Sequence, residues 1–248
     1  MFMRVVSLAP SNTEILYRIG ADNELVATTS LCNYPDGALG KPSLGGWSKG
    51  IKTDKLAEHN PDLVVCSDSL QDRVVEKLES MDFEVLHLKP RTLAEVYGSI
   101  LEIGRAVDRE AEAEKTVEYM REELEKISIN GTRIYCEEWL EPPHFSGNWV
   151  PGVIEAIDGK YFVEEGVRSN TFELEELNQF CPEHIILSIC GTGEKVSDKA
   201  VKDRESWKDI TAVETGNIHI LDDSLLNRPG PRLVEAAKEI EKIVDSRS

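Results

Sequence analysis

The chain has 248 residues and 40% of them are hydrophobic, so it is long enough to bury a core in one large domain or in two smaller ones. Its formal net charge of −18 comes from acidic residues spread along predicted helices, which argues against nucleic acid and anionic membranes as partners. No apolar run approaches the roughly 18 residues that a membrane span needs, so no membrane insertion is expected.

The first part of the chain alternates between predicted strands and helices. The strands are expected at residues 4–9, 25–29, 61–67 and 83–88, and the helices at residues 11–19, 53–59 and 71–81. Between the second strand and the second helix, residues 32–51 form a Gly- and Pro-rich loop that carries Tyr34 and Trp47. Strands that alternate with helices pair in parallel, so we expect a mostly parallel sheet covered by helices.

The middle of the chain, residues 92–129, is expected to be helical. Its second half starts after Asp108 and has one narrow apolar stripe on an otherwise polar surface. The stripe consists of Ala113, Val117, Met120, Leu124 and Ile127. About twenty helical residues at roughly 1.5 Å each make a rod of about 30 Å, the width of a small domain. Two interpretations stay open: the rod joins two lobes, or it is a solvated helix on the flank of a single domain.

The last part of the chain repeats a pattern of the first part. Residues 177–188 match residues 56–67 as a short helix, a proline and a hydrophobic strand in the same order. The other elements expected here are strands at residues 133–139 and 217–221, an aromatic-rich loop at 141–149, a helix at 150–157 and a C-terminal helix that ends near residue 245. Chance can produce so short a repeat. Its position on both sides of the rod favours two α/β lobes, residues 1–107 and 130–248, joined by a backbone helix at residues 108–129.

Two such lobes would enclose a cleft lined by the loops at the carboxyl ends of the strands. These loops carry Tyr34, Trp47, Phe145 and Trp149. Flat, rigid side chains suit a large flat ligand such as a tetrapyrrole, although each ring can instead pack against its own lobe. His144 is a candidate ligand for a metal inside such a macrocycle, or a hydrogen-bonding residue at the rim.

The repeat also places an acidic residue at the same point of each half. Asp54 lies seven residues before Pro61, and Glu175 lies seven residues before Pro182. Matched acids on two lobes would orient the protein on a two-fold symmetric partner through charge-assisted hydrogen bonds to basic pockets. In so acidic a chain, the match can also be accidental.

The sequence shows no familiar catalytic pattern. It contains no P-loop, no Gly-x-Gly-x-x-Gly after a strand, no Gly-x-Ser-x-Gly and no His-Glu-x-x-His. The five histidines are scattered, and the five cysteines lack a Cys-x-x-Cys pair, which favours free buried thiols. We therefore expect a non-catalytic protein without catalytic residues, without a metal bound directly by the protein and without a cofactor.

Four segments resemble the cobalamin-binding substrate-binding proteins of ABC importers, which belong to the helical-backbone class III of periplasmic binding proteins together with haem and ferric-siderophore binders. The segments are Ser7–Glu14, Pro61–Val65, Glu141–Gly147 and Arg228–Arg232. The resemblance implies two Rossmann-like lobes with mostly parallel sheets, joined by one long rigid helix, with a corrinoid in the cleft. It also implies that an acid on each lobe docks to arginines of a permease dimer; the binding protein itself is expected to be a monomer.

Carried over onto this chain, the first-lobe cleft residues of the family are Tyr34 and Trp47, and the docking acids are Asp54 and Glu175. The first docking acid is thus Asp where Glu is usual. The second-lobe cleft tryptophan of the family is Ser169 in this chain.

The family motif Pro-Pro-Phe reads Pro142-Pro143-His144 here, with Phe145 beside it. Trp149 is a candidate replacement for the missing stacking surface, and Arg228 is a further candidate ligand-binding residue.

The leading hypothesis is a solute-binding protein that holds cobalamin or a related corrinoid and delivers it to an ABC importer. A haem or ferric-siderophore binder of the same fold is the first alternative, and a cytosolic corrinoid sensor, carrier or enzyme is the second. The chain as given shows no export signal, which predicts the cytoplasm; the importer role predicts the periplasm or the outer cell surface after removal of a signal.

Overall fold

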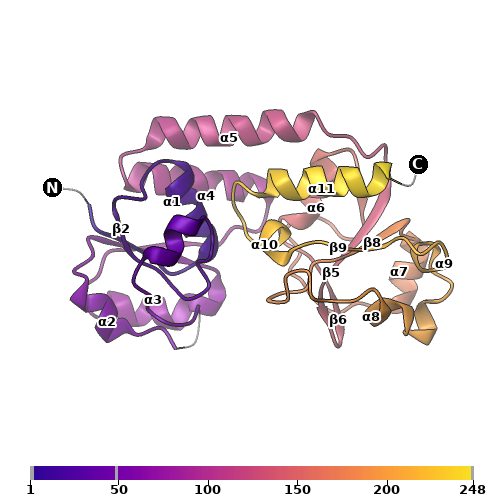
Figure 1. The fold of residues 1–248 in the computed structure, drawn as a ribbon, viewed down its shortest axis with the longest axis horizontal. Helices are drawn as coiled ribbons and strands as arrows, with labels where there is room; N and C mark the ends of the chain where they lie inside the picture. Colours follow the sequence, from indigo (N-terminus) through magenta and orange to yellow (C-terminus); the bar gives the residue numbers. More distant parts are fainter. Residues whose placement is uncertain (1–2, 48–49, 247–248) are drawn as a thin grey trace. The chain divides into compact units, whose positions relative to one another are not determined.

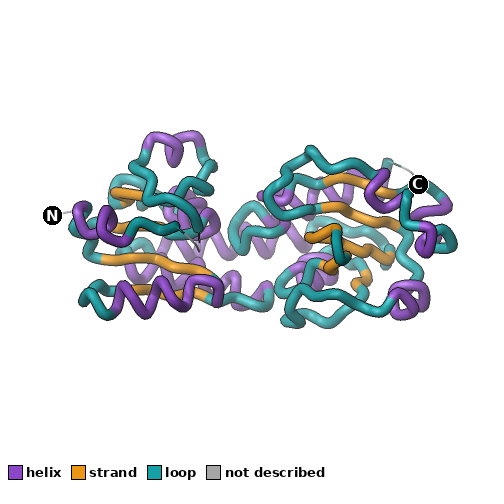
Figure 2. Tube along the Cα trace, turned by 90° about the horizontal axis from the view of Figure 1, so that it is seen from below, coloured by secondary structure: helices purple, strands orange, loops and turns teal. Residues whose placement is uncertain are grey.

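The protein forms two compact units in a computed structural model that describes residues 3–47 and 50–246. Unit 1 comprises Met1–Pro90 and Ala94–Tyr119, and unit 2 comprises Arg91–Leu93 and Met120–Ser248. Each unit has one sheet whose strands are mostly parallel and are flanked by helices, which confirms the expected α/β class (Figures 1 and 2). Within the described ranges, no helix combines the length and the hydropathy that a membrane crossing requires.

The sheet of unit 1 has four parallel strands in the order β2-β1-β3-β4. Their bounds are Val5–Ser7 for β1, Leu25–Ala27 for β2, Leu63–Ser67 for β3 and Val85–Leu88 for β4. The central strand β3 reads Leu-Val-Val-Cys-Ser, and all five of its residues are buried. A continuous apolar run of this kind is typical of a parallel strand that is covered on both faces.

Helices cover both faces of this sheet. They are α1 (Pro10–Arg18), α2 (Thr53–Glu58), α3 (Asp72–Glu79) and α4 (Leu93–Ala106), with short 3-10 turns η1 (Asp36–Gly40) and η2 (Ser69–Gln71). Leu56 of α2 and Leu78 of α3 pack with Val64 of β3 in one core cluster. Figure 1 shows α1 and α4 on the other side of the sheet from α2 and α3.

The helical middle of the chain consists of two helices, and the second of them corresponds to the predicted backbone helix at residues 108–129. α4 ends at Ala106, and α5 (Glu110–Glu125) starts after a break in which Asp108 has a positive φ of 54°. The apolar stripe expected from the sequence is buried along α5. α5 ends at Glu125, before the predicted limit of residue 129, and its first ten residues count with unit 1 and the rest with unit 2.

The sheet of unit 2 has the order β6-β5-β8-β9, and a short strand, β7, also pairs with β5. The strands are β5 (Arg133–Leu140), β6 (Pro143–Phe145), β7 (Lys160–Tyr161), β8 (His184–Leu187) and β9 (Ile218–Ile220). β6 is antiparallel to β5, so the segment that we expected to be a loop, residues 141–149, contains a strand. The expectation of a loop was wrong because a two-residue turn lets residues 143–145 fold back along the end of β5.

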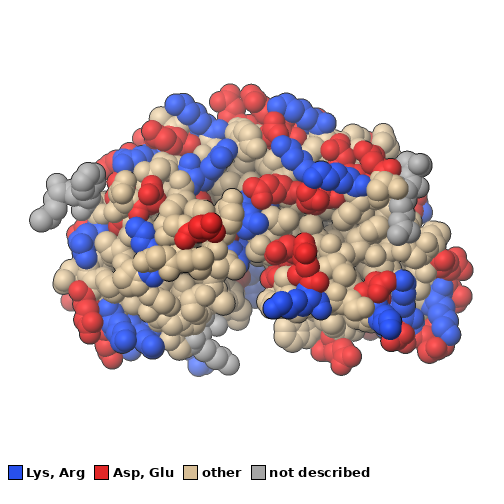
Figure 3. Space-filling model, viewed as in Figure 1, with Lys and Arg blue, Asp and Glu red and all other residues tan. Residues whose placement is uncertain are grey.

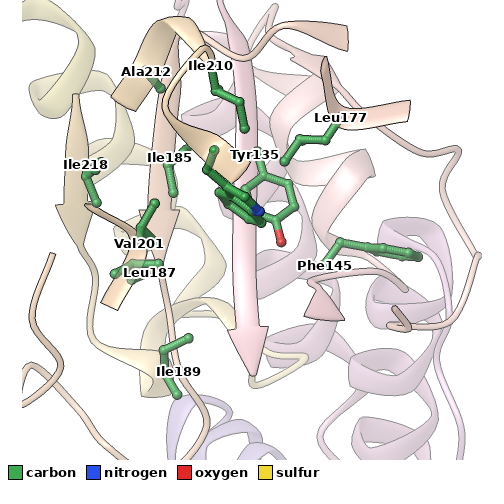
Figure 4. Close-up of a cluster of buried hydrophobic side chains, with 11 residues drawn as sticks. Tyr135, Phe145, Leu177, Ile185, Leu187, Ile189, Val201, Ile210, Ala212 and Ile218 are labelled. Atoms are coloured by element: carbon green, nitrogen blue, oxygen red, sulfur yellow. The ribbon is translucent and has the colours of Figure 1, made fainter. Parts of the chain in front are cut away.

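One face of the second sheet carries most of the aromatic core. Tyr135 of β5 and Leu177 of α7 (Leu174–Phe180) belong to this cluster (Figure 4). Trp207 of the 3-10 turn η3 (Glu205–Trp207) is a further member. The helices of unit 2 are α6 (Val150–Ala156), α7 (Leu174–Phe180), α8 (Lys199–Lys202), α9 (Thr211–Glu214), α10 (Asp223–Leu226) and α11 (Leu233–Asp245), with η3 at Glu205–Trp207. In Figure 1, α6 and α11 lie on the other side of the sheet from α7 and α9.

Charged side chains are distributed over the surface. Figure 3 shows acidic and basic residues interspersed over the visible face, as expected for a net charge of −18 that is carried by helices and not by a tail. Glu123 of α5 pairs with two lysines: it accepts hydrogen bonds from Lys126, at 2.6 Å, and from Lys238 of α11. The hydrogen bonds from the two lysines lower the pKa of Glu123 from 4.5 to about 2.

This pKa shift predicts a pH-dependent contribution of Glu123 to stability. Because the folded pKa lies below the ordinary value, the contribution is complete above about pH 4.5 and is lost as the pH falls toward 2. Urea unfolding of the wild type and of Glu123→Gln at a series of pH values should give a free-energy difference that is present at pH 7 and gone near pH 2. A difference that stays constant over this range would contradict the assignment.

Candidate functional site

In unit 1, one buried glutamine connects the loops at the carboxyl ends of three strands. The Oε1 of Gln71 accepts a hydrogen bond from the backbone N–H of Ser67, at 2.7 Å, and its Nε2 donates to the carbonyl oxygens of Leu8 and Trp47, at 2.8 and 2.7 Å. Ser67 is the last residue of β3, Leu8 directly follows β1, and Trp47 lies in the loop that follows β2. Gln71 is fully buried, so its hydrogen bonds hold the three loops together without competition from water.

The loop between β2 and α2 carries the two aromatic residues that the sequence singled out in unit 1. Tyr34 is 41% exposed, whereas Trp47 is half-buried and its indole Nε1 has no hydrogen-bond partner among the described residues. Within this loop, the backbone N–H of Leu44 donates to the carbonyl oxygen of Thr28 at 2.8 Å. The structure adds apolar candidates that sequence reasoning missed. They are the exposed side chains Leu31 and Leu39 in this loop and Leu70 after β3.

Gln71 should be essential for the stability of unit 1. Replacing it with leucine keeps the volume but leaves the Ser67 N–H and two carbonyl groups without this partner, which predicts a loss of about 3 kcal/mol of unfolding free energy. Urea denaturation measures this loss. The matched control Gln179→Leu changes an exposed glutamine on α7 and should stay within about 0.5 kcal/mol of the wild type. Equal stability of Q71L and Q179L would contradict the prediction.

In unit 2, the hairpin of β5 and β6 carries an aromatic residue that the sequence analysis did not select. Trp139 is 52% exposed and pairs with His144 across the hairpin. The indole Nε1 of Trp139 donates to the carbonyl oxygen of Glu141 at 3.1 Å. The Nδ1 of His144, which is half-buried, lies 2.7 Å from the carbonyl oxygen of Pro142.

Phe145 is a core residue in this structure, which differs from the expectation of a ring displayed by a loop. It is 4% exposed, and its ring makes edge-on contact with Phe162 at a centroid distance of 5.6 Å. The reason is the strand pairing: Phe145 lies opposite Glu137 of β5 and therefore faces the covered side of the sheet. Figure 4 shows Phe145 in the same core cluster as Tyr135.

Trp149 and Arg228 take part in the connections between neighbouring loops. The indole Nε1 of half-buried Trp149 donates to the carbonyl oxygen of Leu226 at 2.9 Å, which ties the start of α6 to the end of α10. Arg228 is half-buried and lies close enough to Asp222 to affect it. Burial raises the pKa of Asp222, but hydrogen bonds from Ser224 and the charges of nearby arginines outweigh this effect, so the net shift is downward.

Ser169, which stands where the family has a tryptophan, has a structural role in this chain. Its Oγ accepts a hydrogen bond from the backbone N–H of Gly147 at 2.9 Å. Asn148 donates its backbone N–H to the carbonyl oxygen of Val167 at 2.6 Å, so the two loops run side by side. A Cβ on Gly147 would collide with Val167, which explains why glycine occupies this position.

A buried ion pair fixes the base of the β5–β6 hairpin. The two terminal nitrogens of Arg204, Nη1 and Nη2, each donate to the carboxylate of Glu137 at 2.7 Å. Nη2 also donates to the carbonyl oxygen of Leu140 at 2.9 Å. The Tyr135 hydroxyl donates to the same carboxylate, and the guanidinium lies 4.5 Å from the ring centroid of Trp207. Burial raises the pKa of Glu137, and the charge of Arg204 opposes that rise.

The two predicted docking acids occupy equivalent places in the two units. Asp54 is the second residue of α2, and Glu175 is the second residue of α7. Both are exposed, and neither makes a hydrogen bond or ion pair with a described residue. Two residues later, Leu56 and Leu177 are fully buried, so each helix is anchored in its own core and presents its acid to solvent.

Unit 2 also contains a cavity of about 550 Å³ beside α7. Its apolar lining comes mainly from Phe145, Phe162, Phe172 and Phe180, and its polar lining includes Arg168 and Glu176. Glu176, Gln179 and Phe180 of α7, the helix that carries Glu175, form part of the cavity lining.

The described residues contain no group of three or more His, Cys, Asp and Glu side chains arranged to hold a metal ion. Burial raises the pKa of the Cys66 thiol to about 12, which keeps it protonated and makes it a poor nucleophile at neutral pH. The expectation of buried thiols holds for Cys32, Cys66 and Cys136, whereas Cys190 is exposed. The candidate residues Tyr34 and Trp139 offer exposed aromatic rings, and His144 offers a ring nitrogen beside Trp139.

Comparison with known proteins identifies the family. The periplasmic binding protein family matches residues 5–129, about half of the chain. The chain belongs to the periplasmic binding protein family. This confirms the resemblance that the four sequence segments indicated.

Relatives of this family member cover nearly the whole chain. The uncharacterized ABC transporter substrate-binding lipoprotein YvrC of Bacillus subtilis is 26% identical, with 97% of this chain and 79% of the relative aligned. The vitamin B12-binding protein of Vibrio parahaemolyticus is also 26% identical, with 96% and 87% aligned. The crystal structure of the periplasmic haem-binding protein HutB of Vibrio cholerae has a TM-score of 0.81 at 19% identity, with 98% of each chain covered, and has the same fold.

Proposed function

We propose that this family member is a non-catalytic substrate-binding protein of an ABC importer and that it binds cobalamin or a related corrinoid. The observation that carries the proposal is the set of exposed flat rings, Tyr34 and Trp139, at the carboxyl ends of the strands in the two sheets. Ligands of parallel α/β sheets bind at this end. A vitamin B12-binding protein among the relatives supports the corrinoid as the ligand.

The rings are held in place before a ligand arrives. The loop of Tyr34 and Trp47 is attached to two other loops through Gln71, and the hairpin of Trp139 is attached to the core through Arg204. A surface that is ordered in advance loses little conformational entropy on binding, which favours tight binding of a rigid macrocycle.

His144 favours haem as a second candidate ligand. A carbonyl oxygen only accepts hydrogen bonds, so the contact of Nδ1 with Pro142 puts the proton of the neutral ring on Nδ1 and leaves a lone pair on Nε2. Histidines that bind metals usually have this arrangement, with the second nitrogen donating to a carbonyl group. His144 would then ligate the iron of haem, or the cobalt of a corrinoid, from one face of the ring.

Titration with ligands tests the proposal and separates its two versions. We expect the wild type to bind cobalamin at micromolar concentration or below, measured by absorbance and calorimetry, in preference to haemin and a ferric siderophore. Tyr34→Ala should weaken binding by about tenfold because a stacked ring is lost. The control Tyr119→Ala removes a tyrosine of similar exposure, 39%, from α5 and should leave the affinity unchanged.

Binding of haemin alone, with a shifted absorbance band, would replace cobalamin by haem as the ligand. Failure to bind any of the three compounds would refute the proposed function.

We further propose that Asp54 and Glu175 dock the protein to the importer. An exposed carboxylate at the start of each short helix can reach an arginine of a permease dimer without first breaking a contact within its own unit. The matched anchoring of the two helices by Leu56 and Leu177 supports this interpretation.

Charge reversal tests the docking. Asp54→Lys combined with Glu175→Lys should abolish binding to the importer in nanodiscs while leaving ligand affinity unchanged. Glu114→Lys with Glu118→Lys, two exposed acids on α5, gives the same change in net charge and should retain docking. Equal loss of docking in both double variants would indicate a general effect of charge, and loss of ligand affinity in the first would contradict the assignment.

A further inference from the structure

The end of β5 extends past its parallel neighbour and carries an exposed tryptophan. The last pair between β5 and β8 joins Glu137 to Leu187, and Trp139 lies two residues beyond it. Its side chain is 52% exposed, whereas tryptophan, a large apolar residue, is mostly buried on average in folded proteins. Trp139 therefore projects from the edge of the sheet at which ligands of parallel α/β sheets bind.

A bulge in the hairpin determines which way this ring points. The pairing of β5 with β6 shifts between Glu137 and Trp139, and after the shift Trp139 lies opposite His144. The next residue, Leu140, packs against the aromatic core of unit 2. Because neighbouring residues in a strand point to opposite faces, Trp139 points away from that core, and His144 shares its face. Bulges commonly redirect a side chain beside a functional site.

The exposed ring is nevertheless held in one place. Its Nε1 donates to the carbonyl oxygen of Glu141, and the neighbouring His144 is bound to the carbonyl oxygen of Pro142. One residue further along the strand, the carbonyl oxygen of Leu140 accepts a hydrogen bond from Arg204 at 2.9 Å. With its polar atom bound to its own hairpin, the indole offers only its flat apolar surface to a partner.

We propose that Trp139 is the stacking surface of unit 2 and that it packs against the face or edge of a flat conjugated ring system in the ligand. This inference rests on the proposed function and names the residue that takes the part of the tryptophan absent at Ser169. Trp149 is less suited to this role, because its ring is half-buried. His144, on the same face as Trp139, would contact the same ring.

Substitutions at Trp139 test the proposal by titration with cobalamin and with haemin. Trp139→Leu keeps an apolar side chain but removes the flat ring, and it should weaken binding of the preferred compound by about tenfold. Trp139→Phe keeps a flat ring and should stay within about threefold of the wild type. Tyr119→Ala is the control for loss of an exposed aromatic residue elsewhere. Urea unfolding should show unchanged stability for Trp139→Leu, since the ring lies outside the core.

Tryptophan fluorescence gives an independent measurement. Ligand binding should quench the wild type more than Trp139→Phe at equal saturation, because the ligand covers the indole at this position. If the wild type binds a ligand and Trp139→Leu binds it equally well, the role of Trp139 is refuted and the proposed function stands. If the wild type binds neither cobalamin nor haemin, the proposed function fails and this inference fails with it.

Discussion

The loops at the carboxyl ends of the strands depend on a few buried polar side chains for their positions. Such loops pair only some of their backbone groups with one another, and a buried backbone group without a partner is costly. Gln71 solves this problem in unit 1 by bonding to the ends of three loops at once. In unit 2, Asp223 accepts hydrogen bonds from the N–H groups of Gly191 and Gly193, both at 2.8 Å, and Asn227 donates to the carbonyl oxygen of Ser188 at 2.7 Å. The candidate ligand-binding residues are thus carried by loops that the sheets hold in place.

The hairpin of unit 2 is held in place by a buried ion pair. Glu137 and Arg204 are bonded in a bidentate pair inside the core, and the pair also binds Tyr135 and the carbonyl oxygen of Leu140. Burying two charges is expensive, and the cost is offset by hydrogen bonds such as those that both carboxylate oxygens of Glu137 accept here. The result is a rigid base for a hairpin whose outer part is exposed. Rigidity at the base and exposure at the end are the two properties that a preformed binding surface needs.

The short repeat in the sequence has a structural counterpart in the two units. α2 leads to β3 through Asn60 and Pro61, and α7 leads to β8 through Cys181 and Pro182. The residue before each proline has a positive φ, 41° for Asn60 and 53° for Cys181. Both segments therefore leave the helix through a residue in the left-handed conformation. The helix starts differ, since only α7 has a capping box, formed by Glu173 and Glu176. Equivalent helices with buried leucines then present Asp54 and Glu175 in matching places.

Sequence reasoning was most reliable where a local pattern has a single physical outcome. The apolar run from Leu63 to Cys66 became most of the buried central strand of unit 1, and the apolar stripe of α5 became its buried face. It failed at residues 143–145, because the pairing of a short strand is decided by a partner strand and not by the strand's own composition. For the same reason Phe145 was expected at the ligand and lies in the core, whereas Trp139 was overlooked.

The sequence by itself determined the α/β class, the alternation of strands and helices, the family and the two matched acids, since each of these is recorded in residue types and their spacing. Only the tertiary structure decided which rings are exposed. A one-residue bulge between Glu137 and Trp139 reverses the faces of the residues that follow, and no sequence pattern marks that bulge. Gln71 likewise looked like the start of an ordinary helix, because two of its three backbone partners, the carbonyl groups of Leu8 and Trp47, lie far from it in the chain and meet it only after folding.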